Sequence, residues 1–520
     1  MENERPRGNE GEAELVAFSP LDGTPLPAVR RMTTDEVAVA VGRARRAQAV
    51  HGARTLRQRI LMLQRFSRAL MRRRYRLVQM ICKETGVPEA EAWMHDIGAI
   101  TRLSEYWSSA LPSLWSSSEH ALSLFGFPSK QALVERYPRG VVGLVTQWGN
   151  PLALPLRTIL PALVSGNAVV HCPGPQKLRS AFLIQESAEE VFGRGLLQVV
   201  PRGPEVAVKF CEEAAQVDAL VFVGDSATGK RVSQAALEAR VPASIELGGK
   251  DVAIVLHDAE LDRAAQGIVW ASMSLAQRSA RLECVIVVAD IAEEFSSRLV
   301  HLISQLTPGQ DYGPLLSRAQ QEKLLLQLAE SNARGAQILV GGHILDRGGI
   351  WFEPTVITEE DAEASIHAES MQGPVVSICV VSDEQEAIEV SRGLSTDIGV
   401  SVWTRDTRRG EVVARSVSAV FLSINNHGFR EAIPSSHPSG ARQSGVHGID
   451  RDVFEIVTRP QTLVVDPGVR KREPWWFPYT HRLVATRRAL SDVRSGGHVG
   501  RRIMATIRWL RAVALRWKNE

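Results

Sequence analysis

Short apolar runs that alternate with stretches of helical composition are the feature that most constrains the fold of this chain. The runs have the composition of buried strands: GVVGLV (140–145), VVH (169–171), LLQVV (196–200), ALVFV (219–223), VAIVL (252–256), VIVVA (285–289) and VSICVVS (376–382). This alternation predicts βαβ units and parallel sheets. The runs fall into two blocks, about 142–249 and 250–432, which predicts two α/β domains.

The segment before these runs has a helical pattern. Residues 34–93 contain long Ala, Leu and Arg stretches with few helix breakers. Leu61, Leu63, Phe66 and Leu70 recur at helical spacing and are predicted to form a core face. The first 13 residues are polar and charged, which predicts a disordered N-terminus and no signal peptide.

Charge is unevenly distributed along the 520 residues, although the net charge is only +3. From Asp466 to Glu520 there are 13 Lys and Arg against 4 Asp and Glu, so this tail carries +9 and the remainder −6. The five cysteines are scattered and show no metal-ligand spacing, so neither a disulfide framework nor a metal site is expected. No uncharged apolar run reaches the length of a membrane span. A cytoplasmic protein is the simplest prediction.

Three loop motifs could carry chemistry. GDSATGK (224–230) fits a phosphate loop, but Arg231 follows where a Mg²⁺-binding hydroxyl would stand. IELGGKD (245–251) places an acid beside two glycines, where Glu246 is either a general base or part of a turn. SLAQRSARLECVIVV (274–288) places Ser279 between Arg278 and Arg281, as a nucleophile or an ordinary loop serine.

Eight motifs together resemble those of the aldehyde dehydrogenase superfamily over residues 15 to 465, in their order and spacing. They are QWGNPLALPL (147–156), SGNAVVHCPG (165–174), FVGDSATG (222–229), ELGGK (246–250), AQRSARLE (276–283), FEPTV (352–356), QGPVVSI (372–378) and SGARQSG (439–445). SATG, DIAEEF (290–295) and GPVVSI are most similar to the succinate-semialdehyde dehydrogenase branch.

The resemblance implies a fold and an assembly. Two Rossmann-type parallel-sheet domains would be joined by an arm that pairs subunits into a dimer or tetramer. The implied boundaries are a coenzyme-binding-type domain (14–123 and 142–249), a catalytic-type domain (250–432), an arm (124–141 and 453–466) and the basic tail (467–520). The family oxidises an aldehyde to an acid with NAD or NADP, using a Cys nucleophile and a Glu that activates water.

The catalytic positions of the family are only partly kept. Ser279 stands at the position of the nucleophilic Cys, and a Ser hydroxyl needs an adjacent base to react. Gly149 stands where the oxyanion-binding Asn is expected, with Asn150 one place later. Glu246 matches the general base. Cys284, five residues after Ser279, is expected to be an inert buried residue.

The cofactor positions also depart from the family pattern. Cys172 replaces the Lys that holds the adenosine ribose, and Asp225 replaces a Ser that meets the pyrophosphate. Ser370 replaces the Glu that clasps the nicotinamide ribose, and Gln372 replaces a neighbouring Phe. The other predicted cofactor contacts match the family: Trp148, Gly224, Gly229 and Leu247.

These substitutions predict a preserved scaffold with a dismantled site. The leading hypothesis is a catalytically inactive family member that acts by binding, as a scaffold, a regulator or a partner of an active paralogue. One alternative is an active dehydrogenase with an altered site, and another is an esterase that uses Ser279 and Glu246.

The basic tail suggests a partner of its own. REPWWFPYTHRL (472–483) sets aromatic residues beside Arg, and residues 499–517 have helical period with one apolar stripe among arginines. A basic amphipathic helix is typical of an anionic membrane surface or an acidic partner, although a helix docked on its own chain would look the same. Nucleic acid is not expected, because no recognised binding module accompanies the charge.

Overall fold

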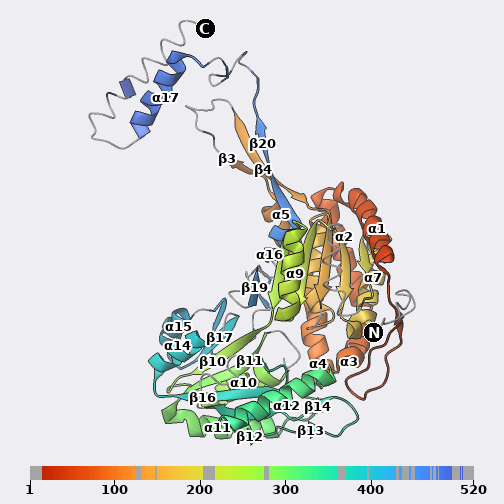
Figure 1. Cartoon of the computed structure of the whole chain (residues 1–520), viewed down its shortest axis with the longest axis vertical. Helices are drawn as coiled ribbons and strands as arrows, with labels where there is room; N and C mark the ends of the chain where they lie inside the picture. Colours follow the sequence, from red (N-terminus) through yellow and green to blue (C-terminus); the bar gives the residue numbers. More distant parts are fainter. Residues whose placement is uncertain are drawn as a thin grey trace, which may run out of the picture. The chain divides into compact units, whose positions relative to one another are not determined.

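A computed structural model of the chain describes most of its residues. They are 14–120, 122, 130–146, 149–202, 217–274, 280–359, 370–394, 398–417, 419–428, 432–435, 444–446, 451–468, 471, 473, 476–477, 479–494, 504 and 506–507. The predicted disordered N-terminus (1–13), Trp148 and Ser279 lie outside the described residues. The chain forms two compact units, one of residues 1–116 and 135–461 and the other of 117–134 and 462–520 (Figure 1).

The predicted helical region is confirmed as a series of helices: α1 (Thr34–Gly52), α2 (Leu56–Arg72), α3 (Arg74–Thr85), α4 (Glu89–Glu91), the π-helix η1 (Ala92–Ile97) and α5 (Gly98–Trp115). Thr33 and Thr55 start α1 and α2 with capping boxes. Leu63, Phe66 and Leu70 are fully buried, as predicted, but Leu61 is 47% exposed. The prediction for Leu61 is wrong. Leu61 lies two residues before Leu63 on the helix, so its side chain points away from the buried face that Leu63 belongs to.

The first parallel sheet confirms the earlier block of apolar runs. Its strand order is β19-β9-β8-β5-β6-β7, and all pairings are parallel except that of β19 with β9. Its elements are β5 (Val141–Thr146), α6 (Ala153–Val164), β6 (Ala168–Pro173), η2 (Pro175–Lys177), α7 (Leu178–Phe192), β7 (Leu197–Val199), β8 (Ala219–Gly224), α9 (Ser226–Glu238), β9 (Ala243–Leu247) and β19 (Gly445–Val446).

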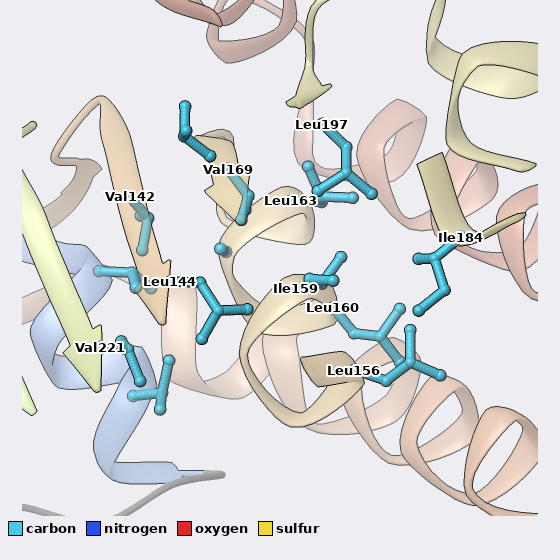
Figure 2. Close-up of a cluster of buried hydrophobic side chains, with 14 of the residues drawn as sticks. Val142, Leu144, Leu156, Ile159, Leu160, Leu163, Val169, Ile184, Leu197 and Val221 are labelled. Carbon is cyan, nitrogen blue, oxygen red and sulfur yellow. The ribbon is translucent and has the colours of Figure 1, made fainter. Parts of the chain in front are cut away.

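The core of this domain lies between the sheet and its helices. Figure 2 shows strand side chains such as Val142, Leu144 and Val169 in one buried cluster with Leu156, Ile159 and Leu160 of α6. Each of these six side chains is at most 1% exposed. Strands β5, β6 and β8 are buried along their whole length, which explains why their sequences are continuous apolar runs rather than alternating ones.

The second sheet confirms the later block, with strand order β12-β15-β16-β11-β10-β17-β18. Only β12 pairs antiparallel. Its elements are β10 (Gly249–Val255), α10 (Leu261–Val269), η4 (Trp270–Ser274), β11 (Ala280–Val288), α11 (Ala289–Ser304), α12 (Arg318–Ala333), β12 (Gln337–Val340), β15 (Thr355–Glu359), β16 (Val375–Val381), α14 (Glu384–Gly393), β17 (Gly399–Trp403), α15 (Thr407–Ser416) and β18 (Phe421–Ile424). The molecule thus has the predicted pair of Rossmann-type sheets.

The remaining elements are short or belong partly to the second unit. Two small antiparallel pairs are β1 (Glu14–Leu15) with β2 (Val29–Arg30) and β13 (Ile344–Leu345) with β14 (Trp351–Phe352). Helix α16 (Arg451–Val457) leads into β20 (Thr458–Val465), which forms a three-stranded sheet with β4 (Gln131–Pro138) and β3 (Ser118–His120). Helix α17 (His481–Arg494) follows in the tail. Among the described residues, no helix is long and apolar enough to cross a bilayer.

Candidate functional site

The carboxyl ends of four adjacent parallel strands bring most of the predicted site residues together. Cys172, the last residue but one of β6, pairs with Val145 of β5, while Gly224 at the end of β8 pairs with Leu247 of β9. Glu246 pairs with Val223 in the same register. Ligands of open α/β sheets bind in the crevice at this edge, so the structure places these residues where a ligand site is expected.

Gly149 and Asn150 follow β5 at this edge. Gly149 has a φ of +88°, and a Cβ there would lie 2.9 Å from Leu154 Cδ2, so glycine suits this turn. The side chain of Asn150 donates through Nδ2 to Asp96 Oδ2 at 2.9 Å. Asp96 Oδ1 also accepts from the backbone N–H groups of Leu152 and Ala153, at 3.0 and 2.8 Å. The amide of Asn150 is therefore drawn into the cap of α6.

A small pocket opens beside this turn. It encloses about 310 Å³, counting the solvent at its mouth, and Ser274 of η4 closes it from the second domain. The other lining residues come from the first domain: Thr85, Val87, Glu91, Asp96, Gly149, Asn150 and Pro151. Two of them are acidic, so a ligand there would meet carboxylates rather than cations.

The start of helix α9 carries its own carboxylate. Asp225 is the N-cap residue, and its Oδ1 accepts from the backbone N–H of Thr228 at 2.8 Å. The side chain of Leu247 covers Gly229, where a Cβ would lie 2.3 Å from Leu247 Cδ2. The first turn of a helix is where backbone N–H groups bind phosphate. Here an acidic side chain of the same loop uses one of these donors.

Cys172 is buried in apolar surroundings at this edge of the sheet. The residue is 4% exposed, and burial raises the pKa of its thiol to about 12, so the thiol is protonated at neutral pH. The neighbouring His171 lies with Nε2 2.9 Å from Thr146 Oγ1, and burial lowers its pKa to about 3. Neither side chain provides a positive charge at neutral pH.

Glu246 is 8% exposed and lies between β8 and β19. Its neighbour in β19 is Gly445, where a Cβ would lie 1.9 Å from the carbonyl oxygen of Ile245. The described chain resumes after position 279 at Ala280, which pairs with Gly249 of β10. The strand that follows the Ser279 position therefore starts beside the short segment that links Glu246 to β10.

Ser370 and Gln372 lie in the second domain and are held by other side chains. Ser370 Oγ donates to Glu283 Oε1 at 2.5 Å, and the backbone N–H of Met371 donates to Glu283 Oε2 at 2.9 Å. Gln372 is exposed, and its carbonyl oxygen accepts from Gln320 Nε2 at 2.7 Å. Our reading of the sequence did not single out Glu283, although its place on β11 gives Ser370 a carboxylate partner.

A buried arginine completes this network. Arg281 is 1% exposed, donates through Nη1 to the carbonyl oxygen of Val375 at 2.8 Å, and has Nη2 3.7 Å from Glu283 Oε1. Burial lowers the pKa of Arg281, and the nearby Glu283 carboxylate opposes that shift. Since Arg281 and Glu283 are both buried, their pairing limits the cost of removing two charges from water.

Comparisons with known proteins agree with this architecture. A family model described as the aldehyde dehydrogenase family matches residues 8–462. A Mycobacterium ulcerans relative, provisionally named succinate-semialdehyde dehydrogenase [NADP(+)] 2, is 30% identical over 439 residues, which cover 82% of this chain and 83% of the relative. The 2-hydroxymuconic semialdehyde dehydrogenase of Pseudomonas sp. is 28% identical, with 83% and 93% covered.

Solved structures show the same fold. A Mycobacterium tuberculosis aldehyde dehydrogenase complexed with NAD⁺ superposes with a TM-score of 0.82 at 25% identity, covering 88% of this chain and 95% of that one. The chain belongs to the aldehyde dehydrogenase family, whose members oxidise aldehydes with NAD or NADP. Within that family it is similar to the succinate-semialdehyde dehydrogenase branch, as the sequence motifs predicted.

Proposed function

We propose that this chain is an aldehyde dehydrogenase family member that no longer oxidises aldehydes with NAD or NADP and acts by binding. The observation that carries the proposal is the cap of α9, where Asp225 accepts the N–H of Thr228. A pyrophosphate at this helix end would meet the Asp225 carboxylate. A like-charge pair about 5 Å apart costs about 3 kcal/mol at an effective dielectric constant near 20.

The ribose positions support the same proposal. The protonated, buried thiol of Cys172 offers neither a charge nor a strong hydrogen bond to a sugar hydroxyl. Ser370 is already bonded to Glu283, which in turn is held by the backbone of Met371. Asp225, Cys172 and Ser370 therefore do not fit a nicotinamide dinucleotide.

Calorimetric titration with NAD⁺ and with NADP⁺, up to millimolar cofactor, tests the proposal. We expect no saturable heat from the unaltered protein. The variant Asp225→Ser with Cys172→Lys restores the pattern of the family at both positions, so it is the matched comparison and is expected to bind more tightly. Saturable binding to the unaltered protein would overturn the proposal.

Turnover provides a second test of the same idea. Aldehyde oxidation near 1 s⁻¹, the low end of ordinary enzyme turnover, would show that an altered site still works. Hydrolysis of an activated ester that disappears in Ser279→Ala would instead favour the esterase alternative with Glu246 as the base. We expect neither activity, because a Ser hydroxyl is a weak nucleophile unless a base activates it.

We further propose that the protein is a cytoplasmic homo-oligomer whose tail contacts an anionic membrane surface. Strand β20 is exposed from its second residue onward, so the sheet of β3, β4 and β20 has room for a second copy. In the tail, Trp476, Phe477 and Tyr479 are 53%, 76% and 64% exposed. Of the predicted helix over 499–517, the structure describes only residues 504, 506 and 507, all helical, and it adds α17 upstream.

Sedimentation with lipid vesicles and light scattering would test these two statements. Binding is expected to vesicles that contain phosphatidylglycerol and not to pure phosphatidylcholine, and to fall with salt. Removal of residues 467–520 should abolish vesicle binding and leave the oligomer intact. Binding of an acidic protein, and not of vesicles, would favour the alternative that the tail binds an acidic partner.

A further inference from the structure

A second, larger pocket lies beside α3 and shares Val87 with the pocket next to Asn150. It encloses about 760 Å³, counting the solvent at its mouth. Its walls come from α3, the turn after it and η1, with one residue each from two distant loops: Tyr75, Val78, Gln79, Cys82, Gly86, Val87, Pro88, Glu89, Trp93, Leu21 and Gly309. We call it the Trp93 pocket. Among the described residues, its lining does not include Gly149, Asn150 or Glu246.

The shape of the Trp93 pocket is built into the backbone. Tyr75, Gln79 and Cys82 follow one face of α3 at helical spacing. The helix ends at Gly86, whose φ of +74° favours glycine, and a Cβ there would lie 2.5 Å from Pro314 Cγ. The turn after α3, which leads into Glu89 of α4, is therefore held by close packing, which favours a preformed site over one that assembles on binding.

Two aromatic rings and a carboxylate meet in the Trp93 pocket. The rings of Tyr75 and Trp93 lie 5.3 Å apart at 76°. Trp93 Nε1 donates to Glu89 Oε1 at 3.0 Å, which fixes the indole and the carboxylate relative to each other. The guanidinium of Arg74 already lies 4.6 Å from the centre of the Tyr75 ring, so Trp93 is the aromatic surface left for a ligand.

Nearby carboxylates make the electrostatic potential around Cys82 in the pocket negative. Burial raises the pKa of the Cys82 thiol to about 11, and the carboxylates of Glu89, Asp96 and Glu91 add to that rise. Near the start of α3, Arg73 and Arg76 lie 3.1 and 3.7 Å from Glu186 on α7, whereas Arg74 lies at the Tyr75 ring. Carboxylates beside an indole favour a cation over an anion or a neutral ligand.

We propose that the Trp93 pocket binds a small organic cation, with an ammonium group between the indole face of Trp93 and the carboxylate of Glu89. A trimethylammonium or primary ammonium group is compact enough to reach both, and the apolar wall of Val78, Val87 and Pro88 would cover its carbon substituents. The described lining of this site contains none of the residues at the predicted dinucleotide and aldehyde positions, so the proposal does not depend on the function proposed above.

Calorimetry with choline as the probe tests this proposal, with 3,3-dimethylbutan-1-ol as the uncharged ligand of the same shape. Choline is expected to bind the full-length protein at least about tenfold more tightly than the alcohol, because the indole face and the carboxylate both attract a cation. Glu89→Gln and Trp93→Leu should each weaken choline binding by about fivefold or more. Circular dichroism confirms that each variant is folded.

A matched Tyr–Glu pair on β4 provides the control. Tyr137 OH donates to Glu135 Oε2 at 3.0 Å, outside the pocket, so Glu135→Gln should leave choline binding unchanged. Equal affinity for choline and the alcohol would overturn the proposal by showing an apolar groove with no preference for charge. Absence of saturable choline binding, or choline binding unaffected by both Glu89→Gln and Trp93→Leu, would also overturn it.

Discussion

The N-termini of helices α7 and α9 lie in the same domain and both bind a carboxylate, yet they obtain it differently. At α7 the acceptor is Glu84, 95 residues earlier in the chain, which accepts from Arg179 N at 2.7 Å and from the N–H and hydroxyl of Ser180. At α9 the acceptor is Asp225 in the adjoining loop, three residues before Thr228. Glu84 is 1% exposed, whereas Asp225 is partly exposed.

The two caps differ in role. Glu84 is a structural cap, whereas Asp225 stands at a position where the resemblance implies a ligand contact. Glu84 joins α3 to α7 inside the core, and burial raises its pKa to about 7 despite the hydrogen bonds that oppose the shift. The hydrogen bond from Thr228 to Asp225 is local, and Asp225 stands where the family resemblance implies a contact with pyrophosphate. On the function proposed above, the supports that hold the fold are kept, while the residue expected to meet a ligand has changed.

Removal of the buried cap should have the largest effect on stability. Glu84→Ala leaves the donors of Arg179 and Ser180 without their acceptor, and we expect a loss of about 3 kcal/mol in the free energy of unfolding. Urea denaturation measures it. Glu84→Gln, which keeps one acceptor oxygen, should lose less. Equal stability of Glu84→Ala and the unaltered protein would mean that α7 is held by packing alone.

Acid should destabilise the same domain through His171. Its pKa falls from 6.5 to about 3 on folding because of burial, so below pH 6.5 the unfolded state binds more protons. Stability present above pH 6.5 is therefore lost as pH falls, at up to about 1.4 kcal/mol per pH unit, or about 2 kcal/mol between pH 6.5 and 5. Denaturation curves of the unaltered protein and His171→Gln should diverge over this range, and parallel pH profiles would contradict it.

A smaller effect is expected at Gly149, next to the ligand edge. Gly149→Ala forces a Cβ to within 2.9 Å of Leu154 Cδ2 at a φ of +88°, with an expected cost of about 1 kcal/mol. Gly149→Asn, which restores the residue of the family, should cost less strain than Gly149→Val, since Asn tolerates positive φ better than a branched side chain. Melting temperatures of the three variants would rank them.

The smallest change in stability is expected at Asp225. Asp and Ser are both good N-cap residues, so Asp225→Ser should change the free energy of unfolding by about 0.5 kcal/mol or less. Its effect should show in NAD⁺ titrations instead. A loss as large as that of Glu84→Ala would remove the contrast between the two helix ends, because Asp225 would then be a structural cap as well.

Local sequence was sufficient where the interaction is local. The buried strands could be predicted because continuous apolar runs with short helical connections have few alternative folds. Asp225 could be placed at the start of α9 from its motif, and its bond to Thr228 follows from the spacing of an N-cap. Leu61 shows the limit of the helical pattern. The pattern assigns it to the core face of α2, but it lies outside the buried stripe and is exposed to solvent.

Contacts between distant segments could not be predicted. Asn150 was considered for an oxyanion role, but its preference for Asp96, 54 residues away, depends on how η1 packs against α6. The family resemblance predicts a Glu at the position of Ser370, while the partner of Ser370, Glu283, lies 87 residues earlier and comes within reach through the pairing of β11 with β16. The Trp93 pocket likewise needs Leu21 and Gly309 to close around α3.

The sequence by itself determined the two sheets and the order of the family motifs, and it predicts which residues stand at the nucleophile and cofactor positions of the family. These depend on periodicity and spacing, which are properties of neighbouring residues. Only the tertiary structure decided which carboxylate serves which partner: Asp96 for Asn150, Glu84 for α7, and Glu283 for Ser370. A buried hydrogen bond forms between atoms that the packed fold brings within reach, and chain separation carries no information about that distance.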